Sequence, residues 1–297
     1  MKVLISGSRG LVGSETVEYL TRRGHEVTRL LRPNSSNGHQ GVMWDPQAKT
    51  VDKAGLNGFN GVIHLAGENI ASGRWTPQKK ERLVASRVGP TRLLCEALAS
   101  LEQKPEVLIC ASAIGYYGDR GDEYLTEDSE KGEGFLADLC QQWEAATQPA
   151  KDAGIRVVNA RLGIILSRKG GALKKMLLPF KFGAGGVLGS GRQYMSWIHI
   201  HDVVRAFEFL LEQVNISGPV NLVAPNPVNN KTFTRSLGGA LFRPTFFSVP
   251  KMGARLAFGE MADSLLLSSA AVEPRVLNKF GFPFEHRDVK WALKSLV

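Results

Sequence analysis

Three glycines near the start of the chain have a spacing that suits phosphate binding. Gly7, Gly10 and Gly13 follow an apolar run over residues 3–5, which predicts a buried strand, and precede a predicted helix over residues 14–23. Glycine lets the backbone turn sharply and approach a ligand closely, while a helix N-terminus offers unpaired N–H groups. This order of strand, glycine turn and helix predicts a dinucleotide pyrophosphate site, although the spacing is G-x-x-G-x-x-G instead of G-x-G-x-x-G.

Two segments are expected to contact the dinucleotide. The first is the glycine loop, made of Gly7, Ser8, Arg9, Gly10, Leu11, Val12 and Gly13. The second is the end of a predicted strand over residues 61–67, where small residues permit close backbone approach: Leu65, Ala66 and Gly67.

Two arginines decide which dinucleotide we expect. A predicted strand over residues 25–31 is followed by Arg32, at a place where an NAD site usually carries a carboxylate for the ribose 2′-hydroxyl. Arg9 lies inside the glycine loop. Guanidinium groups bind phosphate through two parallel hydrogen bonds, so this pair predicts the 2′-phosphate of NADP (NADPH). The alternative is that both arginines are solvated surface residues.

Strands and helices alternate over residues 1–225. This alternation predicts an α/β fold with a doubly wound parallel sheet covered on both faces, which is an NAD(P)-binding Rossmann domain. The further strands are predicted over residues 105–112, 155–161 and about 219–223, and long helices over residues 76–100 and 135–151.

Two later segments are expected to form a smaller, substrate-side lobe. Residues from about 167 to 196 are rich in glycine and in basic side chains, and we expect them to be an insertion in the 1–225 domain that contributes to this lobe. Residues 226–297 are predicted to be mostly helical and to complete the lobe. The inserted segment could cradle an anionic substrate such as a nucleotide diphosphate, or it could be a solvated loop.

Composition restricts the class of protein. The formal net charge of +9 favours anionic ligands, but the basic residues are dispersed and form no nucleic-acid-binding motif. No apolar run is long enough to span a bilayer, so we expect neither a nucleic acid nor a membrane as partner. Three cysteines without C-x-x-C spacing predict free thiols and a cytoplasmic location. The sequence is compatible with a homodimer.

Several short motifs resemble those of extended short-chain dehydrogenase/reductases of the nucleotide-sugar epimerase type. Besides the glycine loop, these are HLAGEN over residues 64–69 and WIHIHD over residues 197–202. A narrower resemblance is to the atypical epimerase family subgroup, also described as sugar-nucleotide epimerase-like or cell-division-inhibitor-like. It rests on Arg74-Trp75, Ser86-Arg87, GYYG over 115–118, LPF over 178–180, GSGR over 189–192 and FGEM over 258–261.

The resemblance implies functional residues, which match only in part. Ser112 stands where the family carries a catalytic serine. Glu68 lies in the family's cofactor-binding strand end, and Arg87 replaces a common asparagine. The family's Tyr-x-x-x-Lys pair, in which lysine lowers the pKa of a proton-shuttling tyrosine, is absent from the sequence. Leu136 and Cys140 occupy the two corresponding positions.

Two tyrosines could replace the missing pair. Tyr116 and Tyr117 closely follow Ser112 at the carboxyl end of a predicted strand, where doubly wound sheets bind their ligands. One of them could act as a proton donor, and Ser112 could donate a hydrogen bond to a carbonyl group. The alternative for the tyrosines is half-buried packing with a hydrogen-bonded hydroxyl.

The histidines of the WIHIHD segment do not predict a metal site. His199 and His201 could point to one face of a strand, but no cluster of further ligands with matching spacing is found in the sequence. We therefore expect these histidines to pack or to form hydrogen bonds, with no metal bound.

Two functions remain open at this level. One is an NADP(H)-dependent oxidoreductase or epimerase acting on a sugar-nucleotide-like or small anionic carbonyl substrate. The other is a catalytically impaired protein that binds NADP(H) and acts as a redox sensor or interaction protein. The glycine loop and the arginines are compatible with both, and the absent Tyr-x-x-x-Lys pair favours the second.

Overall fold

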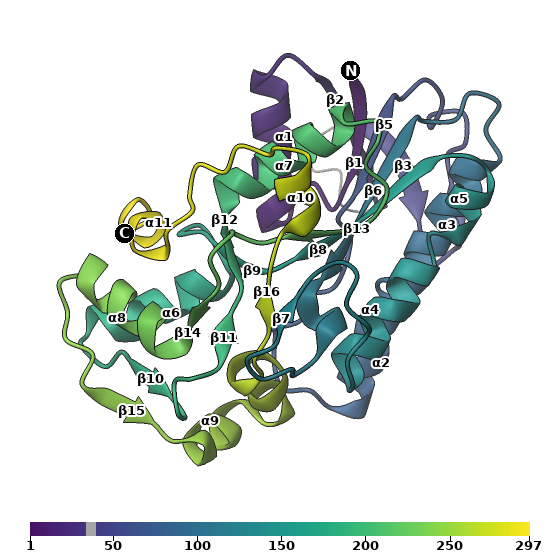
Figure 1. Cartoon of the computed structure of the whole chain (residues 1–297). Helices are drawn as coiled ribbons and strands as arrows, with labels where there is room; N and C mark the ends of the chain where they lie inside the picture. Colours follow the sequence, from purple (N-terminus) through teal and green to yellow (C-terminus); the bar gives the residue numbers. More distant parts are fainter. Residues whose placement is uncertain (34–39) are drawn as a thin grey trace.

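The computed structural model describes residues 1–33 and 40–297 (Figure 1). Its centre is an eight-stranded sheet in which all neighbours are parallel except the last two. In spatial order the strands are β13 (Gly218–Leu222), β8 (Arg156–Leu162), β6 (Val107–Ala113), β5 (Gly61–His64), β1 (Lys2–Ser6), β2 (Glu26–Leu31), β3 (Gly41–Asp45) and β4 (Thr50–Val51). The predicted α/β fold with a parallel sheet is confirmed.

The sheet is doubly wound around β1. The chain first adds β2, β3 and β4 on one side of β1, and then crosses back to add β5, β6, β8 and β13 on the other side. The order therefore reverses between β1 and β5. In such sheets, ligands bind outside the carboxyl ends of the strands at this reversal, and the glycine loop follows β1 at that place.

Alternate residues of each strand belong to different cores. Val3 and Ile5 pack with Phe207 of α7 (Ile200–Glu212) and with α1 (Leu11–Arg22), whereas Leu4 packs with Leu94 of α3 (Val88–Ala99). In Figure 1, α1 and α7 cover one face, and α3 and α5 (Gln148–Asp152) cover the other. Because neighbouring strand residues point to opposite faces, this pattern buries both sides of the sheet.

Two predicted helices are divided in the structure. The helix expected over residues 76–100 forms α2 (Pro77–Ala85) and α3, and the helix expected over 135–151 forms α4 (Phe135–Ala145) and α5. Arg87 lies at the first break, where its guanidinium donates to the Leu83 carbonyl oxygen at 3.1 Å.

The smaller lobe combines two distant segments. The first supplies α6 (Gly171–Lys181), β10 (Gly186–Leu188) and β11 (Tyr194–Met195); the second supplies β14 (Val228–Asn229), α8 (Asn230–Ala240), β15 (Phe247–Val249) and α9 (Lys251–Phe258). β10 pairs with β15, β11 pairs with β14, and a shared core contains Phe180, Trp197 and Phe233. In Figure 1 these elements lie together at one end of the molecule.

Other short elements tie the lobe to the sheet domain. β9 (Ile164–Leu166) pairs with β12 (Trp197–His199), and α11 (Val289–Lys294) packs against α8. After η2 (Ala262–Leu267), β16 (Ala271–Val272) pairs with β7 (Tyr124–Leu125), and α10 (Arg275–Lys279) follows. Leu277, Phe282 and Phe284 enter the same core as α1 and α7. The last part of residues 226–297 therefore packs against the sheet domain as well.

Candidate functional site

The glycine loop folds tightly between β1 and α1. Gly7 has a φ angle of +65°, and its carbonyl oxygen accepts the Gly10 N–H at 2.9 Å. A Cβ atom on Gly7 would lie 2.6 Å from the Leu65 carbonyl carbon, and a Cβ atom on Gly13 would lie 2.2 Å from the Gly7 oxygen. Backbone alone therefore forms this part of the loop. The N–H groups of the first α1 turn have no helical partner and suit a phosphate.

The segment after β5 lies directly against this loop. A Cβ atom on Gly7 would be 2.9 Å from the Ala66 nitrogen, and Ser6 Oγ accepts the Leu65 N–H at 3.1 Å. The structure thus brings the two predicted cofactor-binding segments together. This backbone cradle, which a single methyl group would fill, fits a dinucleotide pyrophosphate.

His64 joins the two strand ends from inside the protein. Its Nδ1 lies 2.7 Å from Ser6 Oγ, and its Nε2 lies 3.0 Å from Thr91 Oγ1. Trp143 Nε1 donates to the same threonine oxygen at 3.0 Å. Complete burial lowers the pKa of His64 to about 4, so the ring is neutral near pH 7.

Glu68 and Arg87 hold the strand end from the helix side. Arg87 Nη2 donates to the Glu68 carbonyl oxygen at 2.8 Å, and the Arg87 guanidinium carbon is 3.3 Å from the position of a Cβ on Gly67. Lys79 Nζ donates to the Glu68 carboxylate at 2.5 Å, and this hydrogen bond lowers the pKa of the carboxyl group. Arg87 is buried, so it supports the backbone that borders the site.

Three arginines surround the glycine loop on the β2 side. Arg9 is exposed in the loop, and Arg32 is exposed directly after β2. Arg29 of β2 is missing from the sequence prediction, yet its Nη1 donates to the Ser8 carbonyl oxygen at 3.0 Å. The available signal was a charged residue in a strand predicted to be buried on both faces.

The lobe also borders the glycine loop, which the sequence did not predict. A Cβ atom on Gly170 or on Gly171 would lie 3.3 Å from the Leu11 side chain. Lys169 Nζ pairs with the Glu15 carboxylate of α1 at 2.6 Å. The glycine pair before α6 thus permits the lobe to approach the start of α1.

Ser112, near the end of β6, belongs to a buried ion-pair network. Its Oγ donates to Glu144 Oε1 at 2.7 Å. Arg161 of β8 donates to both oxygens of that carboxylate, from Nε at 2.8 Å and from Nη2 at 2.9 Å. A two-point pair of this kind fixes the orientation of the carboxylate, and therefore that of Ser112.

Arg161 also distinguishes the two tyrosines of η1 (Ile114–Tyr117). Tyr117 is fully buried, donates to Asn221 Oδ1 at 2.7 Å and accepts from Arg161 Nη1 at 2.9 Å. Burial raises its pKa to about 12. Tyr117 therefore does not fit the catalytic role expected for it, because its hydroxyl is occupied inside the core. Tyr116 is half-buried, and its ring centre lies 3.5 Å from the Arg161 guanidinium carbon.

Leu136 and Cys140 pack against η1 and do not supply the chemistry of the absent Tyr-x-x-x-Lys pair. A Cβ atom on Gly115 would lie 3.2 Å from Leu136 Cβ and 3.8 Å from Cys140 Sγ. Burial raises the pKa of the Cys140 thiol to about 12, so it is protonated near pH 7. Neither side chain supplies the positive charge of a lysine.

The histidines of the WIHIHD segment form contacts with the C-terminal residues. His199 stacks on His286 with ring centres 3.7 Å apart, and His201 Nδ1 pairs with Glu285 at 2.9 Å. The side chains of His201, Glu285 and His286 offer ligand atoms within 4.8 Å of one another. Arg205 Nε already pairs with Glu285 at 3.2 Å. The absence of a bound metal stays a prediction.

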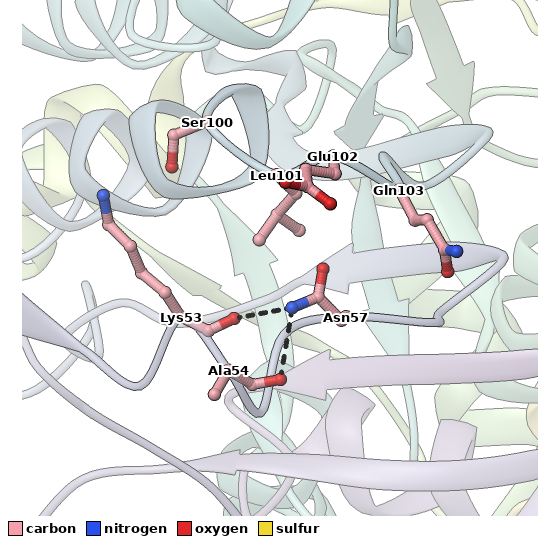
Figure 2. Close-up of a pocket in the computed structure, with 7 residues that line it drawn as sticks. All are labelled: Lys53, Ala54, Asn57, Ser100, Leu101, Glu102 and Gln103. Atoms are coloured by element: carbon pink, nitrogen blue, oxygen red, sulfur yellow. Dashed lines mark hydrogen bonds between the residues drawn. The ribbon is translucent and has the colours of Figure 1, made fainter.

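A cavity of about 590 Å³ lies elsewhere, and Figure 2 shows the residues that line it: Lys53, Ala54, Asn57, Ser100, Leu101, Glu102 and Gln103. Asn57 Nδ2 donates to the Lys53 and Ala54 carbonyl oxygens at 3.4 Å. These residues come from the loops before β5 and β6, at the amino ends of the strands. The cavity is therefore separate from the site at the carboxyl ends.

Comparison with protein families agrees with this geometry. Residues 3–222 match the NAD dependent epimerase/dehydratase family, and residues 249–296 match a domain of unknown function, DUF1731. The chain belongs to the NAD-dependent epimerase/dehydratase family. The predicted resemblance is thereby confirmed, and so is an NAD(P)-binding Rossmann-like fold.

Members of this family are similar over nearly the whole chain. Epimerase family protein Mb2239 of Mycobacterium bovis is 44% identical over 291 residues, covering 98% of this chain and 96% of that protein. Human epimerase family protein SDR39U1, crystallised with NADPH, has a TM-score of 0.91 at 33% identity, covering 100% of this chain and 99% of the human one. A nucleoside-diphosphate sugar epimerase of Corynebacterium glutamicum has a TM-score of 0.82 at 37% identity; this chain is covered completely, but only 58% of that chain.

The cradle leads to a first prediction, that Gly7→Ala abolishes dinucleotide binding. Gly24 is the matched control: its φ is +86°, but a Cβ there would meet nothing within 4 Å. Gly24→Ala therefore carries only left-handed strain of roughly 1–2 kcal/mol, whereas Gly7→Ala also displaces the Leu65 peptide. NADPH fluorescence titration and thermal unfolding of both variants test this. Unchanged NADPH affinity in Gly7→Ala would contradict it.

A second prediction concerns acid stability. The pKa of His64 is lowered from 6.5 to about 4, so its contribution is fully present above pH 6.5 and is lost as the pH falls towards 4. At pH 5 the loss is about 2 kcal/mol of unfolding free energy. Urea unfolding at pH 7 and pH 5 should show this extra loss in the wild type relative to His64→Gln. His199, whose pKa is also lowered to about 4, is common to both proteins. Equal losses in the two proteins would refute the assignment.

Proposed function

We propose that this protein is an NADP(H)-dependent oxidoreductase or epimerase acting on a small anionic carbonyl or sugar-nucleotide-like substrate. The observation that carries the proposal is the position of Ser112 and Tyr116 relative to the glycine loop. They lie at the end of β6, which is separated from β1 only by β5. The cofactor cradle and two hydroxyl groups therefore share one edge of the sheet. Bound NADPH would supply a hydride.

The NADP form of the cofactor is supported by charge. Arg9 is exposed in the glycine loop and Arg32 is exposed directly after β2, where Rossmann sites bind the adenosine ribose, and no carboxylate follows β2 directly. The human relative was crystallised with NADPH. A 2′-phosphate between two guanidinium groups would gain charge-assisted hydrogen bonds that NAD lacks.

Ser112 and Tyr116 would have different roles toward the substrate. The Ser112 hydroxyl proton is directed to Glu144, and it would turn to the substrate carbonyl when that oxygen arrives. The Tyr116 hydroxyl would supply the proton. Its ring lies on the Arg161 guanidinium, whose charge would stabilise the negative charge left on the phenol oxygen. This arrangement would replace the absent Tyr-x-x-x-Lys pair.

The substrate class follows from the lobe beside the site. Lys175 Nζ of α6 donates to the Ala71 carbonyl oxygen at 2.7 Å, so α6 lies over the loop that continues from Glu68. Lys174 belongs to the same helix. These cations favour an anionic substrate. The Corynebacterium relative is named a nucleoside-diphosphate sugar epimerase, which agrees with this class.

A second function is favoured by Leu136 and Cys140. Both are packed and uncharged where the family's catalytic pair belongs. A protein of this design could bind NADP(H) without turnover and serve as a redox sensor or interaction protein. Tight NADPH binding without oxidation of NADPH by any carbonyl or sugar-nucleotide substrate would support this second function.

The third prediction tests the cofactor. The double variant Arg9→Ala/Arg32→Ala should lose about 100-fold in NADPH affinity but less than about threefold in NADH affinity, because only NADPH carries the 2′-phosphate. Fluorescence titration with both nucleotides measures the difference. Lys53→Ala, at the distant cavity, serves as the charge control. Equal losses for both nucleotides would show that the arginines do not bind this phosphate.

The fourth prediction tests the hydroxyl groups. Tyr116→Phe should lower kcat by about 10²–10⁴-fold, the usual contribution of a general acid, without changing the Kd of NADPH. Tyr117→Phe is the matched control, which should lower the melting temperature and leave kcat within about tenfold. Ser112→Ala should lower kcat as well. Turnover that survives both Ser112→Ala and Tyr116→Phe would exclude these two residues as catalytic groups.

A further inference from the structure

The smaller lobe has an uneven charge distribution. Residues 167–196 and 226–259 contain no Asp or Glu, although the whole chain contains 28. The same two segments contain six and five basic residues, eleven in all. All eleven are exposed: Arg168, Lys169, Lys174, Lys175, Lys181, Arg192, Lys231, Arg235, Arg243, Lys251 and Arg255. The fold thus gathers two acid-free segments into one strongly basic lobe.

Large apolar side chains are exposed on this lobe. Phe246 is 90% exposed, Phe242 is 86% exposed and Phe182 is 82% exposed. Five further side chains are at least 43% exposed: Leu178, Phe247, Met252, Leu256 and Phe258. Aromatic side chains this open to water rarely gather on one part of a protein unless that part binds something.

Direct contacts bring some of these residues together at one end of the lobe. Arg243 Nε donates to the Lys181 carbonyl oxygen at 3.0 Å, so the segments that carry Phe242 and Phe182 lie close together. Phe247 of β15 pairs with β10, and α9 follows β15 directly. Figure 1 shows β10, β15 and α9 at the end of the lobe away from the sheet. We call the exposed side chains of Lys181, Phe182, Phe242, Arg243, Phe246, Phe247 and Lys251 the apolar–basic surface.

We propose that the apolar–basic surface docks on an anionic lipid bilayer. Exposed aromatic side chains insert at the boundary between headgroups and acyl chains, while lysine and arginine bind anionic headgroups. A second copy of the chain suits this surface less well, because a two-fold contact would bring two basic surfaces together. A nucleic-acid duplex would contact the charges through its phosphates and leave the phenylalanines in water, because its bases are paired and stacked on one another.

Surface docking is distinct from spanning a membrane. No helix in the described ranges 1–33 and 40–297 is long and apolar enough to cross a bilayer. The prediction of no membrane partner was based on this criterion, which does not apply to a protein that lies on the headgroups. Docking concerns only the lobe surface and does not depend on the proposed enzymatic function.

Sedimentation with vesicles tests the docking. The full-length protein is mixed with vesicles of phosphatidylcholine alone, or of equal parts of phosphatidylcholine and phosphatidylglycerol. We expect binding to the anionic vesicles only, with a partition coefficient that falls when salt is raised. NADPH affinity and melting temperature are measured on every variant, so that a folding defect is recognised.

Two sets of variants separate the charge from the apolar contribution. Phe182→Ser/Phe242→Ser/Phe246→Ser and Lys181→Gln/Arg243→Gln/Lys251→Gln should each lower the partition coefficient, the second by about 100-fold. The matched controls are Val214→Ser, exposed outside the lobe, and Lys49→Gln/Lys53→Gln/Lys104→Gln, which removes three exposed charges elsewhere. Both controls should bind as the wild type does.

Several results would overturn the proposal. The first is that the protein does not bind anionic vesicles, and the second is that it binds both vesicle types equally. The third is that the phenylalanine variant binds as well as the wild type, which would show only a general affinity for anions. A wild-type dimer in light scattering that the phenylalanine variant converts to a monomer would assign the surface to a second copy of the chain.

Discussion

The candidate site depends on the close approach of two backbone segments, Gly7 and the peptide between Leu65 and Ala66. A single methyl group on Gly7 would lie within 2.6 Å of that peptide, so only glycine permits the contact. Several buried interactions hold the segments at this distance, including the hydrogen bonds of Ser6 to Leu65 and to His64. The result is a tight turn at the start of α1, where unpaired N–H groups and the helix dipole favour phosphate.

The second constraint is the buried pair of Glu144 and Arg161. Each charge alone would be costly away from water, and the two-point contact compensates both. The pair also decides how the neighbouring hydroxyl groups are used. Arg161 and Glu144 orient Ser112, Arg161 donates to the Tyr117 hydroxyl, and the Tyr116 ring stacks on Arg161. In the proposed mechanism, this salt bridge takes the place of the family's lysine.

Local sequence signals predicted the parallel sheet and the order of strand, glycine turn and helix correctly, but they failed where distant segments meet. Arg29 escaped notice because its contact with the Ser8 carbonyl depends on how β2 lies beside β1. The break at Arg87 was missed because apolar periodicity does not show that an arginine side chain will bind the Glu68 backbone across the site. Tyr116 and Tyr117 could not be distinguished, since adjacent residues of the same type differ only in what surrounds them.

The sequence by itself determined the order of strands and helices, the glycine loop after the first strand and the absence of the Tyr-x-x-x-Lys pair. These features depend on residue type, on the pattern of neighbouring residues and on the φ angles that glycine allows. Only the tertiary structure decided that Tyr117 is buried and that residues 167–196 and 226–259 lie together in one basic lobe. The reason is physical: burial and surface charge are sums over segments far apart in the chain, and the fold sets which segments contribute.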